Sequence, residues 1–330
     1  MRALICRQWG AIDGLEIGDL PIPEPAADEL LIRVEATAVN YADSIMVAGR
    51  YQTKPPLPFS PGLETAGIVE RCGCDARGFK PGDRVMAILA YGGLAEYAVA
   101  PAAETFAIPP GMDFAEAGAF PVAYISSHVA IRWQGRLEAG ETILVLGAAG
   151  GVGLTAVEIG KAMGARVIAA ASSPERLAVA VAHGADATID YSREPLTERV
   201  MALTGDNGVD VCFDPVGGDL FDAALSSLAW GGRILLVGFV GGIPQIPANR
   251  LLVKHRAALG SSLRYFRWHA PEKLRQSAEE LLLWWGEGRL RPLVTHRLPL
   301  ERAVEAMRLL TERRAHGKVV VELGPQAETA

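Results

Sequence analysis

The chain has 330 residues, 50% of them hydrophobic, and a formal net charge of -6. A chain of this length exceeds the usual size of one hydrophobic core, so we expect two domains. Acidic and basic residues are interspersed without a basic stripe, which argues against nucleic acid as a partner. Four cysteines are too few for a disulfide framework in so long a chain, and reduced thiols in a cytoplasm are the simpler interpretation.

Neither a signal peptide nor a membrane helix is expected. The N-terminal segment MRALICRQWG has an apolar run too short for a signal peptide. The longest apolar stretch, TILVLGAAGGVGLTAV, is shorter than the roughly 20 residues of a membrane-spanning helix, and its glycines favour a turn. We therefore expect a soluble, cytoplasmic protein with no membrane partner.

The first third of the chain predicts β-structure. Its candidate strands are short runs rich in β-branched residues and separated by Gly/Pro turns such as KPGD: ELLIRVEATAV, TAGIVERC, DRVMAIL and AEYAVAP. We find no sustained helical period before about residue 113.

The middle of the chain alternates apolar runs with helical patterns from Thr142 onward. The predicted strands are TILVL, RVIAAA, ATID, VDVCFD, RILLVG and AALGSS, and the predicted helices span residues 152–163, 174–182, 195–204 and 219–229. Strands that are apolar throughout and alternate with helices are typical of a parallel sheet covered on both faces.

The tail predicts two amphipathic helices and a final strand. The segment PEKLRQSAEELLLWWGEG begins at Pro271 and places four apolar residues on one face: Leu274, Leu281, Leu282 and Trp285. LERAVEAMRLLTERR is the second helix, and GKVVVEL is a strand apolar enough to need a sheet. The β-rich first third is the obvious sheet, which would make that domain discontinuous.

The stretch LVLGAAGGVGLTAV places a glycine-rich turn between a strand ending at Leu146 and a helix beginning near Val152. This is typical of a dinucleotide-binding turn, in which the helix N-terminus offers N–H groups and partial positive charge to phosphates. Gly150 would admit a pyrophosphate close to the backbone, Gly153 would allow close helix–strand packing, and Ala148 stands where the first glycine is usual. The predicted phosphate-binding residues are Ala148, Gly150, Gly151, Val152 and Gly153. The alternative is a tight turn that binds nothing.

The end of the second strand decides the expected cofactor. In a dinucleotide fold this end lies beside the adenosine ribose, where a carboxylate favours NAD(H). Here Ser172 and Ser173 can donate to a 2′-phosphate and Arg176 can pair with it, while Tyr191, just past the third strand, adds a phenol. These residues predict NADP(H). Glu175 leaves NADH open, because its carboxylate could turn toward the ribose.

Several motifs together carry a family resemblance: MRAL, AVNYAD, LPFSPGLETAGIVE, FKPGDRV, GGLAEYAV, LGAAGGVG and HGKVVVEL. With these motifs the chain resembles the medium-chain dehydrogenase/reductase superfamily, and within it the zinc-free quinone oxidoreductase branch. The resemblance implies an α/β fold with a GroES-like catalytic domain split around a Rossmann NADP-binding domain. It assigns residues 1–122 and 263–330 to the catalytic domain and 123–262 to the Rossmann domain. It also implies a homodimer formed through the strand near Ala257–Ser262.

The resemblance also allows a residue-by-residue test for zinc. In the family's zinc alcohol dehydrogenases a cysteine ligand takes the place of Asn40, and a histidine ligand precedes the glutamate that is Glu64 here. That preceding position is Leu63 in this chain, and the four-cysteine structural zinc loop has no counterpart. Asparagine and leucine do not form a zinc site, so we expect no metal.

By the same resemblance, Asn40 and Tyr51 are the predicted catalytic residues. An amide and a phenol can both donate to a quinone or carbonyl oxygen. The alternative is that Asn40 caps a turn and Tyr51 only packs, and Asp43 is expected to orient its neighbours. Five further residues match family positions near the cofactor: Tyr124, Phe239, Val240, Leu263 and Lys318.

The function implied by the resemblance is hydride transfer from NADPH to a quinone or an α,β-unsaturated carbonyl. The family's bacterial quinone oxidoreductases often carry a second tyrosine where Ile45 stands, which leaves quinone specificity open. One alternative is an enoyl-thioester reductase acting on acyl-CoA or acyl-carrier substrates, for which Arg50, Arg264 and Arg267 could supply positive charge. The other is a catalytically idle NADPH-binding protein.

Overall fold

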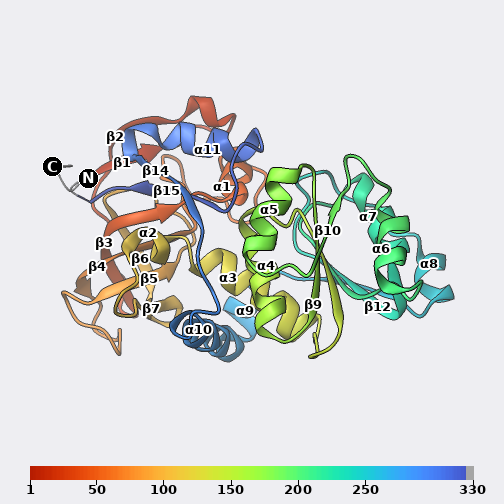
Figure 1. Ribbon diagram of the computed structural model, residues 1–330. Helices are drawn as coiled ribbons and strands as arrows, with labels where there is room; N and C mark the ends of the chain where they lie inside the picture. Colours follow the sequence, from red (N-terminus) through yellow and green to blue (C-terminus); the bar gives the residue numbers. More distant parts are fainter. Residues whose placement is uncertain (325–330) are drawn as a thin grey trace. The chain divides into compact units, whose positions relative to one another are not determined.

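The computed structural model describes residues 1–324 (Figure 1). Contacts within the chain divide it into two compact units. Unit 1 contains Met1–Val122 and the chain from Pro292 onward, and unit 2 contains Ala123–Arg291. Each unit has its own sheet and its own buried apolar core.

Unit 1 is built on a mixed sheet in the order β14-β15-β3-β4-β5-β7, with β6 paired to β3. The strands are β3 (Glu29–Ala38), β4 (Glu64–Cys72), β5 (Arg84–Ile88), β6 (Tyr97–Pro101), β7 (Thr105–Ala107), β14 (Val294–Pro299) and β15 (Lys318–Glu322). A separate antiparallel pair joins β1 (Arg2–Ile5) to β2 (Glu16–Asp19). The β-rich character expected for the first third is confirmed.

The last strand joins the sheet of the N-terminal segment, as its apolar sequence predicts. In β15 the residues Val319, Val320 and Val321 are fully buried. The strand runs antiparallel to β3, with Val320 opposite Ala38. A strand with both faces buried must pair on a sheet that is covered on both sides, which explains why the chain returns to unit 1.

The helices of unit 1 are short: α1 (Tyr41–Val47), α2 (Phe114–Gly118) and α11 (Ala303–Thr311), with single 3-10 turns η1 (Ile12–Gly14), η2 (Ala102–Glu104) and η4 (Leu300–Arg302). Helix α1 lies before residue 113, in the part of the chain where the sequence shows no sustained helical period. This helix has 7 residues, too few to show a period, and its start is held by the Asp43 carboxylate, which accepts from the Asn40 backbone N–H at 2.7 Å.

Unit 2 is built on a parallel sheet of six strands in the order β10-β9-β8-β11-β12-β13. The strands are β8 (Thr142–Leu146), β9 (Arg166–Ala171), β10 (Ala187–Asp190), β11 (Val209–Asp214), β12 (Leu228–Leu236) and β13 (Ala257–Gly260). This is the Rossmann order, with the first strand beside the point where the order reverses, and ligands of such sheets bind at the carboxyl ends of the strands there.

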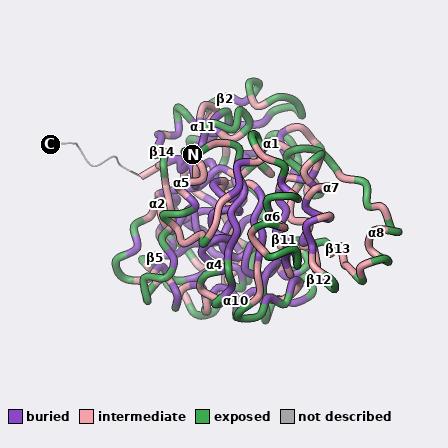
Figure 2. Tube along the Cα trace, turned by 45° about the vertical axis from the view of Figure 1, so that its right-hand side comes forward, coloured by how far each residue is buried: buried purple, intermediate pink, exposed green. Residues whose placement is uncertain are grey.

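In unit 2, α3 (Pro121–His128, begun in unit 1) and the π-helical η3 (Val129–Gln134) precede the first strand. The helices that follow the strands are α4 (Gly151–Ala162), α5 (Pro174–Ala182), α6 (Leu196–Thr204), α7 (Asp219–Ser226), α8 (Ala248–Val253), α9 (Leu263–His269) and α10 (Pro271–Gly286). In Figure 2 strand β11 lies in the buried part of the trace and α8 lies in an exposed part. Within residues 1–324, no helix has both the length and the apolar character needed to cross a bilayer.

The division by contacts differs from the predicted domain boundaries over residues 263–291, which fall in unit 2. These residues form α9 and α10, and α10 packs on η3: Trp133 Nε1 donates to Ser277 Oγ at 2.9 Å. On the predicted apolar face of α10, Leu274 and Leu281 are buried, whereas Leu282 and the tryptophan Trp285 are only partly buried. Trp284 is the buried one, and its ring lies 5.5 Å from that of His128.

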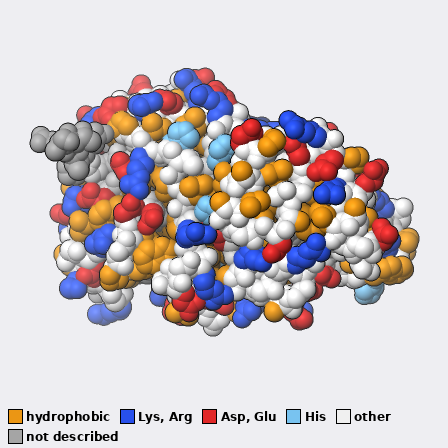
Figure 3. Space-filling model, in the orientation of Figure 1, with side chains coloured by type: hydrophobic (Ala, Val, Ile, Leu, Met, Phe, Trp, Pro, Cys, Tyr) orange, Lys and Arg blue, Asp and Glu red, His pale blue; other side chains and the backbone are white. Residues whose placement is uncertain are grey.

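Charged side chains of both signs are interspersed on the face drawn in Figure 3. Many of them form exposed ion pairs along the surface, such as Arg2–Glu301 and Lys80–Asp83. Such pairs contribute little to stability, because water screens them and the side chains lose freedom when they meet.

Candidate functional site

The glycine-rich turn of unit 2 connects β8 to α4. Gly147 follows β8 with a φ of 59, and Gly150 is the N-cap of α4. The first bond into the helix runs from Leu154 N to Gly150 O at 2.8 Å. The amides of Gly151, Val152 and Gly153 precede that bond, so they have no acceptor within the helix and are available to an anion.

The two glycines of this turn have different reasons to be glycine. A Cβ on Gly153 would lie 2.1 Å from the carbonyl oxygen of Gly147, so no other residue fits there without moving the turn. A Cβ on Gly150 would lie 3.3 Å from the same oxygen, which a small adjustment accommodates. Packing within the turn therefore requires glycine at Gly153, whereas Gly150 leaves space open at the N-terminus of α4. Ala148 is fully buried and its amide donates to Ala170 O, so it shapes the turn, and its contact with a cofactor stays a prediction.

The predicted 2′-phosphate residues gather at the carboxyl ends of β9 and β10. Ser173 is the N-cap of α5, and its hydroxyl oxygen accepts from Arg176 N at 3.4 Å. Ser172 is exposed just before it. Tyr191 lies beside the end of β9, because its amide donates to Ala171 O at 3.1 Å. The structure thus brings these four residues to one end of the sheet.

Two charged residues complete this end of the sheet. A hydrogen bond from Ser173 holds the pKa of the exposed Glu175 carboxyl below its ordinary value, and the nearby Arg193 acts in the same direction. Arg193, which the sequence interpretation missed, exposes 71% of its side chain and lies 3.5 Å from Asp190. Its only sequence signal was its place shortly after the third strand of the sheet.

Tyr124, predicted near the nicotinamide, has its hydroxyl hydrogen-bonded to a buried carboxylate. The Tyr124 hydroxyl donates to Glu158 Oε2 at 2.6 Å, and both side chains are buried. The other oxygen of Glu158 lies 2.7 Å from His183 Nδ1 and accepts from Arg291 N at 3.1 Å. The Tyr124 hydroxyl is therefore hydrogen-bonded within unit 2, and its partner Glu158 was not predicted from the sequence.

The remaining cofactor candidates of unit 2 follow its last two strands. Phe239 and Val240 lie in the segment after β12, with 45% and 36% of their surfaces exposed. Leu263 is the first residue of α9, shortly after β13. All three thus follow the carboxyl ends of β12 and β13, the edge of a parallel sheet where ligands bind.

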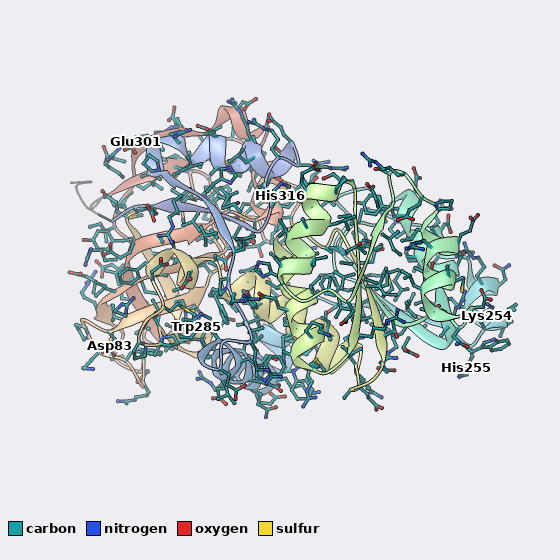
Figure 4. All side chains as sticks on the ribbon, in the orientation of Figure 1. Asp83, Lys254, His255, Trp285, Glu301 and His316 are labelled. Atoms are coloured by element: carbon teal, nitrogen blue, oxygen red, sulfur yellow. The ribbon has the colours of Figure 1, made fainter. Side chains whose placement is uncertain are left out.

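Unit 1 contains a buried polar cluster that joins residues from three distant segments. The Lys318 ammonium donates to Asn40 Oδ1 at 2.7 Å and to Glu64 Oε1 at 2.9 Å. Asn40 Nδ2 donates to Glu64 Oε1 at 2.9 Å. His316, labelled in Figure 4, marks the segment that leads into β15 and hence to Lys318. The sequence predicted that Asn40 contacts the acceptor and that Lys318 lies near the cofactor. In the structure the two side chains are hydrogen-bonded to each other.

The backbone anchors both carboxylates of this cluster. Glu64 is fully buried, and its second oxygen accepts from Val122 N at 2.7 Å. Asp43 is also fully buried and accepts from Asn40 N at 2.7 Å and from Gly62 N at 3.2 Å. Burial raises the pKa of Asp43 to about 7, against the hydrogen bond from Asn40, and the charge of Glu64 adds to the rise. Asp43 thus orients its neighbours, as expected.

Tyr51 lies shortly after α1 in the chain. It is partly buried and packs against the apolar core of unit 1, which includes Met46 and Val47. This packing agrees with the alternative that its ring is structural, while its role toward a substrate stays a prediction.

The residues at the family's zinc positions do not fit a zinc ion. The Asn40 amide is hydrogen-bonded to Lys318 and Glu64, and Leu63 is buried in the apolar core. The Lys318 ammonium lies among the groups that would have to bind the cation. Among residues 1–324, no three His, Cys, Asp or Glu side chains come together in a way that could hold a metal.

Comparison with known proteins identifies the class. The family model described as "Alcohol dehydrogenase GroES-like domain" matches residues 26–110, and the one described as "Zinc-binding dehydrogenase" matches residues 151–282. A GroES-like domain and a Rossmann domain in one chain define the medium-chain dehydrogenase/reductase architecture, and the chain is an oxidoreductase of this class.

The particular branch follows from individual relatives. The quinone oxidoreductase-like protein 2 homolog of Nematostella vectensis is 36% identical over 325 residues, which are 97% of this chain and 88% of that protein. Human quinone oxidoreductase is 31% identical over 308 residues, covering 93% of this chain and 92% of its own. The quinone oxidoreductase of Thermus thermophilus, solved also in complex with NADPH, superimposes with a TM-score of 0.86 at 36% identity and covers 98% of this chain and 100% of its own. The chain belongs to the quinone oxidoreductase branch of the superfamily.

Proposed function

We propose that the chain transfers a hydride from NADPH to a quinone or an α,β-unsaturated carbonyl compound without the help of zinc. The observation that carries this proposal is the cluster of Lys318, Asn40 and Glu64, which puts an ammonium among the residues at the family's metal position. In the family's zinc alcohol dehydrogenases the metal acidifies the alcohol, whereas a quinone or an enone is electron-poor already. The oxidoreductase class, together with an ammonium at the family's metal position, therefore favours a quinone or an enone as the acceptor.

The glycine turn and the ends of β9 and β10 support the choice of cofactor. NADPH, when bound, supplies the hydride. Its pyrophosphate would bind the amides of Gly151, Val152 and Gly153 at the start of α4, with Gly150 leaving room for the approach.

The 2′-phosphate would bind at the carboxyl ends of β9 and β10. We assign it to the hydroxyls of Ser172, Ser173 and Tyr191 and to Arg176, with Arg193 as a further cation. We place the nicotinamide at the carboxyl ends of β12 and β13, near Phe239, Val240 and Leu263.

Asn40 would act on the acceptor. As the hydride arrives, negative charge develops on the acceptor's oxygen, and a donor aimed at that oxygen lowers the barrier. The Asn40 amide supplies such a donor, and Tyr51 would shape the acceptor's surroundings from the core of unit 1.

The assembly and location are proposed on separate grounds. Strand β13 lies at the end of the sheet order, and Trp230 and Leu252 near it expose 72% and 83% of their surfaces. Lys254 and His255, labelled in Figure 4, mark the turn between α8 and β13. An open strand edge beside exposed apolar residues favours pairing with a second copy, so we propose a homodimer. The four free cysteines fit a cytoplasmic location.

The first test measures the loss of reduced-nicotinamide absorbance with NADPH and NADH side by side. Each is offered a small quinone, a 2-alkenal and an enoyl thioester. We expect NADPH to be consumed with the quinone or the alkenal, and a chelator to leave the rate unchanged. A preference for the enoyl thioester would assign the chain to that reaction instead. Tight NADPH binding without turnover of any acceptor would make it a binding protein.

A further inference from the structure

The proposed function needs a group that stabilises the negative charge on the acceptor's oxygen, and the cluster around Lys318 can supply one. A zinc ion would draw electron density from the acceptor's oxygen, and the residues here do not fit zinc. We propose that Lys318 takes over this task through Asn40: its ammonium, held on Oδ1, polarises the amide, so that Nδ2 donates more strongly to the oxygen that becomes negative. Lys318 is then a positioning residue, and Asn40 is the group that touches substrate. This inference rests on the proposed function.

The orientation of the Asn40 amide follows from its two charged partners. With the oxygen toward Lys318 Nζ at 2.7 Å and the nitrogen toward Glu64 Oε1 at 2.9 Å, each contact joins a donor to an acceptor. Turning the amide over would set NH2 against an ammonium and a carbonyl oxygen against a carboxylate. The charged pair therefore permits one orientation only.

One of the two amide hydrogens is less firmly held than the other. Nδ2 donates to the Glu64 carboxylate at 2.9 Å, and its other hydrogen reaches Ala38 O at 3.3 Å. A neutral acceptor at the longer distance is the weaker partner. An acceptor oxygen that approaches Asn40 can replace the bond to Ala38 O, while Glu64 and Lys318 keep the amide in place.

The positive charge of Lys318 is held rigidly. Only 6% of its surface is exposed, and its backbone N–H donates to Leu293 O at 2.8 Å at the start of β15. Glu64, which holds the ammonium, is itself tied to Val122 N. In this dry setting a charge polarises a hydrogen-bonded neighbour more strongly than it would in water, because linked hydrogen bonds strengthen one another.

The chemistry balances without a metal and without proton loss from Lys318. The C–H bond at the nicotinamide C4 would break. The hydride would bond either to the β-carbon of an enone, whose C=C π electrons shift to the oxygen, or to one oxygen of a quinone, whose other oxygen takes the negative charge. NADPH is oxidised by two electrons and the acceptor is reduced by two. The acceptor's oxygen becomes negative while Asn40 donates to it, and a proton from solvent then neutralises the product. Asn40 and Lys318 are unchanged at the end of the cycle.

The test is a double-mutant cycle with Lys318→Met and Asn40→Ala. We expect Lys318→Met alone to lower kcat about 10- to 100-fold with little change in the affinity for NADPH. In the Asn40→Ala background the same change should cost less than about threefold, because the amide through which Lys318 acts is gone. Lys318→Arg, which keeps the charge, should restore most of the rate. Lys161→Met is the matched control, since it removes a lysine–carboxylate pair in unit 2, and should leave kcat unaltered.

Other results would overturn the inference. Additive losses in the cycle would mean that Lys318 acts without Asn40. Weaker NADPH binding at unchanged kcat would make Lys318 a cofactor residue, as the resemblance implies. If Lys318→Met does not fold, Lys318→Gln keeps a neutral donor and enters the same cycle.

A further measurement needs no lysine variant. Asn40→Ala should slow an enone, whose enolate oxygen is strongly basic, more than a quinone, whose reduced oxygen is less basic. Equal losses for both acceptors would also contradict the inference. If the unaltered chain reduces no acceptor at all, the proposed function fails before this inference is reached.

Discussion

The two candidate sites of this chain differ in the chemical groups that form them. The turn between β8 and α4 uses backbone amides within one short stretch, and the helix end itself creates its affinity for an anion. The cluster in unit 1 uses side chains, and its central contact joins Asn40 to Lys318, separated by 278 positions in the chain. A backbone site is visible in local sequence, whereas a side-chain cluster exists only when the sheet brings its members together.

The same contrast applies to the energetics. The amides at the start of α4 have no acceptor within the helix, so their cost depends on whether water or an anion satisfies them. The cluster buries an ammonium and two carboxyl groups, whose desolvation is offset only by hydrogen bonds among themselves and to the backbone. Removing one member should therefore harm unit 1 far more than loss of an exposed charge.

The largest effect is expected for Glu64→Ala. This change removes the acceptor of Lys318, Asn40 and Val122 N together, and leaves an ammonium buried without its counter-charge. We expect the free energy of unfolding to fall by about 3–5 kcal/mol in urea denaturation. Glu301→Ala, at the exposed pair with Arg2, is the control and should cost at most about 1 kcal/mol. Equal losses for both variants would remove the distinction between the buried cluster and the surface.

The next effect is a dependence on pH through Asp43. Its pKa is about 7 in the folded chain against an ordinary 3.8, so between these values the folded state holds a proton that the unfolded state has lost. The contribution of Asp43 to stability is therefore full below pH 3.8 and falls by about 4 kcal/mol as the pH rises to about 7. Asp43→Asn should abolish this part of the pH dependence, at a constant cost for the hydrogen bond it loses. Unfolding curves of both proteins between about pH 4.5 and 7.5 measure the difference, and parallel pH profiles would contradict it.

Substitutions at the two glycines of the turn should affect stability and NADPH binding separately. Gly153→Ala should lower the free energy of unfolding by about 1–3 kcal/mol, because its Cβ would meet Gly147 O at 2.1 Å. Gly150→Ala should leave the stability nearly unchanged but weaken NADPH binding about tenfold, since the methyl group would enter the space kept for the pyrophosphate. Thermal unfolding and NADPH titration of both variants test this pair. If Gly150→Ala binds NADPH normally, the pyrophosphate does not approach there.

The residues after β9 should set the preference between NADPH and NADH. Arg176→Ala is expected to weaken NADPH binding about tenfold and to leave NADH binding unaltered, because only NADPH carries the 2′-phosphate. Glu175→Gln should act in the opposite direction, since it removes a negative charge beside Ser173. The ratio of kcat/KM for the two cofactors is the measurement. A chain that prefers NADH before any change would make Glu175, and not Arg176, the deciding residue.

The smallest effect is expected for Tyr124→Phe. The change deletes one donor to the buried Glu158 while His183 and Arg291 N still serve that carboxylate. We expect a loss of about 1–2 kcal/mol in unfolding free energy and a kcat within about twofold of the original. A large fall in kcat with unchanged stability would show that the Tyr124 hydroxyl acts on the reaction.

Much of the fold could be predicted because its elements carry local patterns. The strands of unit 2 are continuous apolar runs, and their alternation with helices predicts a parallel sheet. The turn after Leu146 and the cap at Ser173 likewise depend on neighbours a few positions away. Helix α1 was missed because its start depends on one carboxylate, Asp43, and not on a repeating pattern.

The sequence by itself determined the class of fold, the glycine turn and the absence of the family's zinc ligands, because each can be recognised from residue types within short motifs, wherever those motifs lie in the chain. Only the tertiary structure decided the partners of the buried charges. It joined Lys318 to Asn40 and Glu64, turned the Tyr124 hydroxyl to Glu158, and placed Trp284 rather than Trp285 in the core. The physical reason is that a buried polar group must find its partner wherever the packed elements bring one within hydrogen-bond distance, and no local pattern encodes that distance.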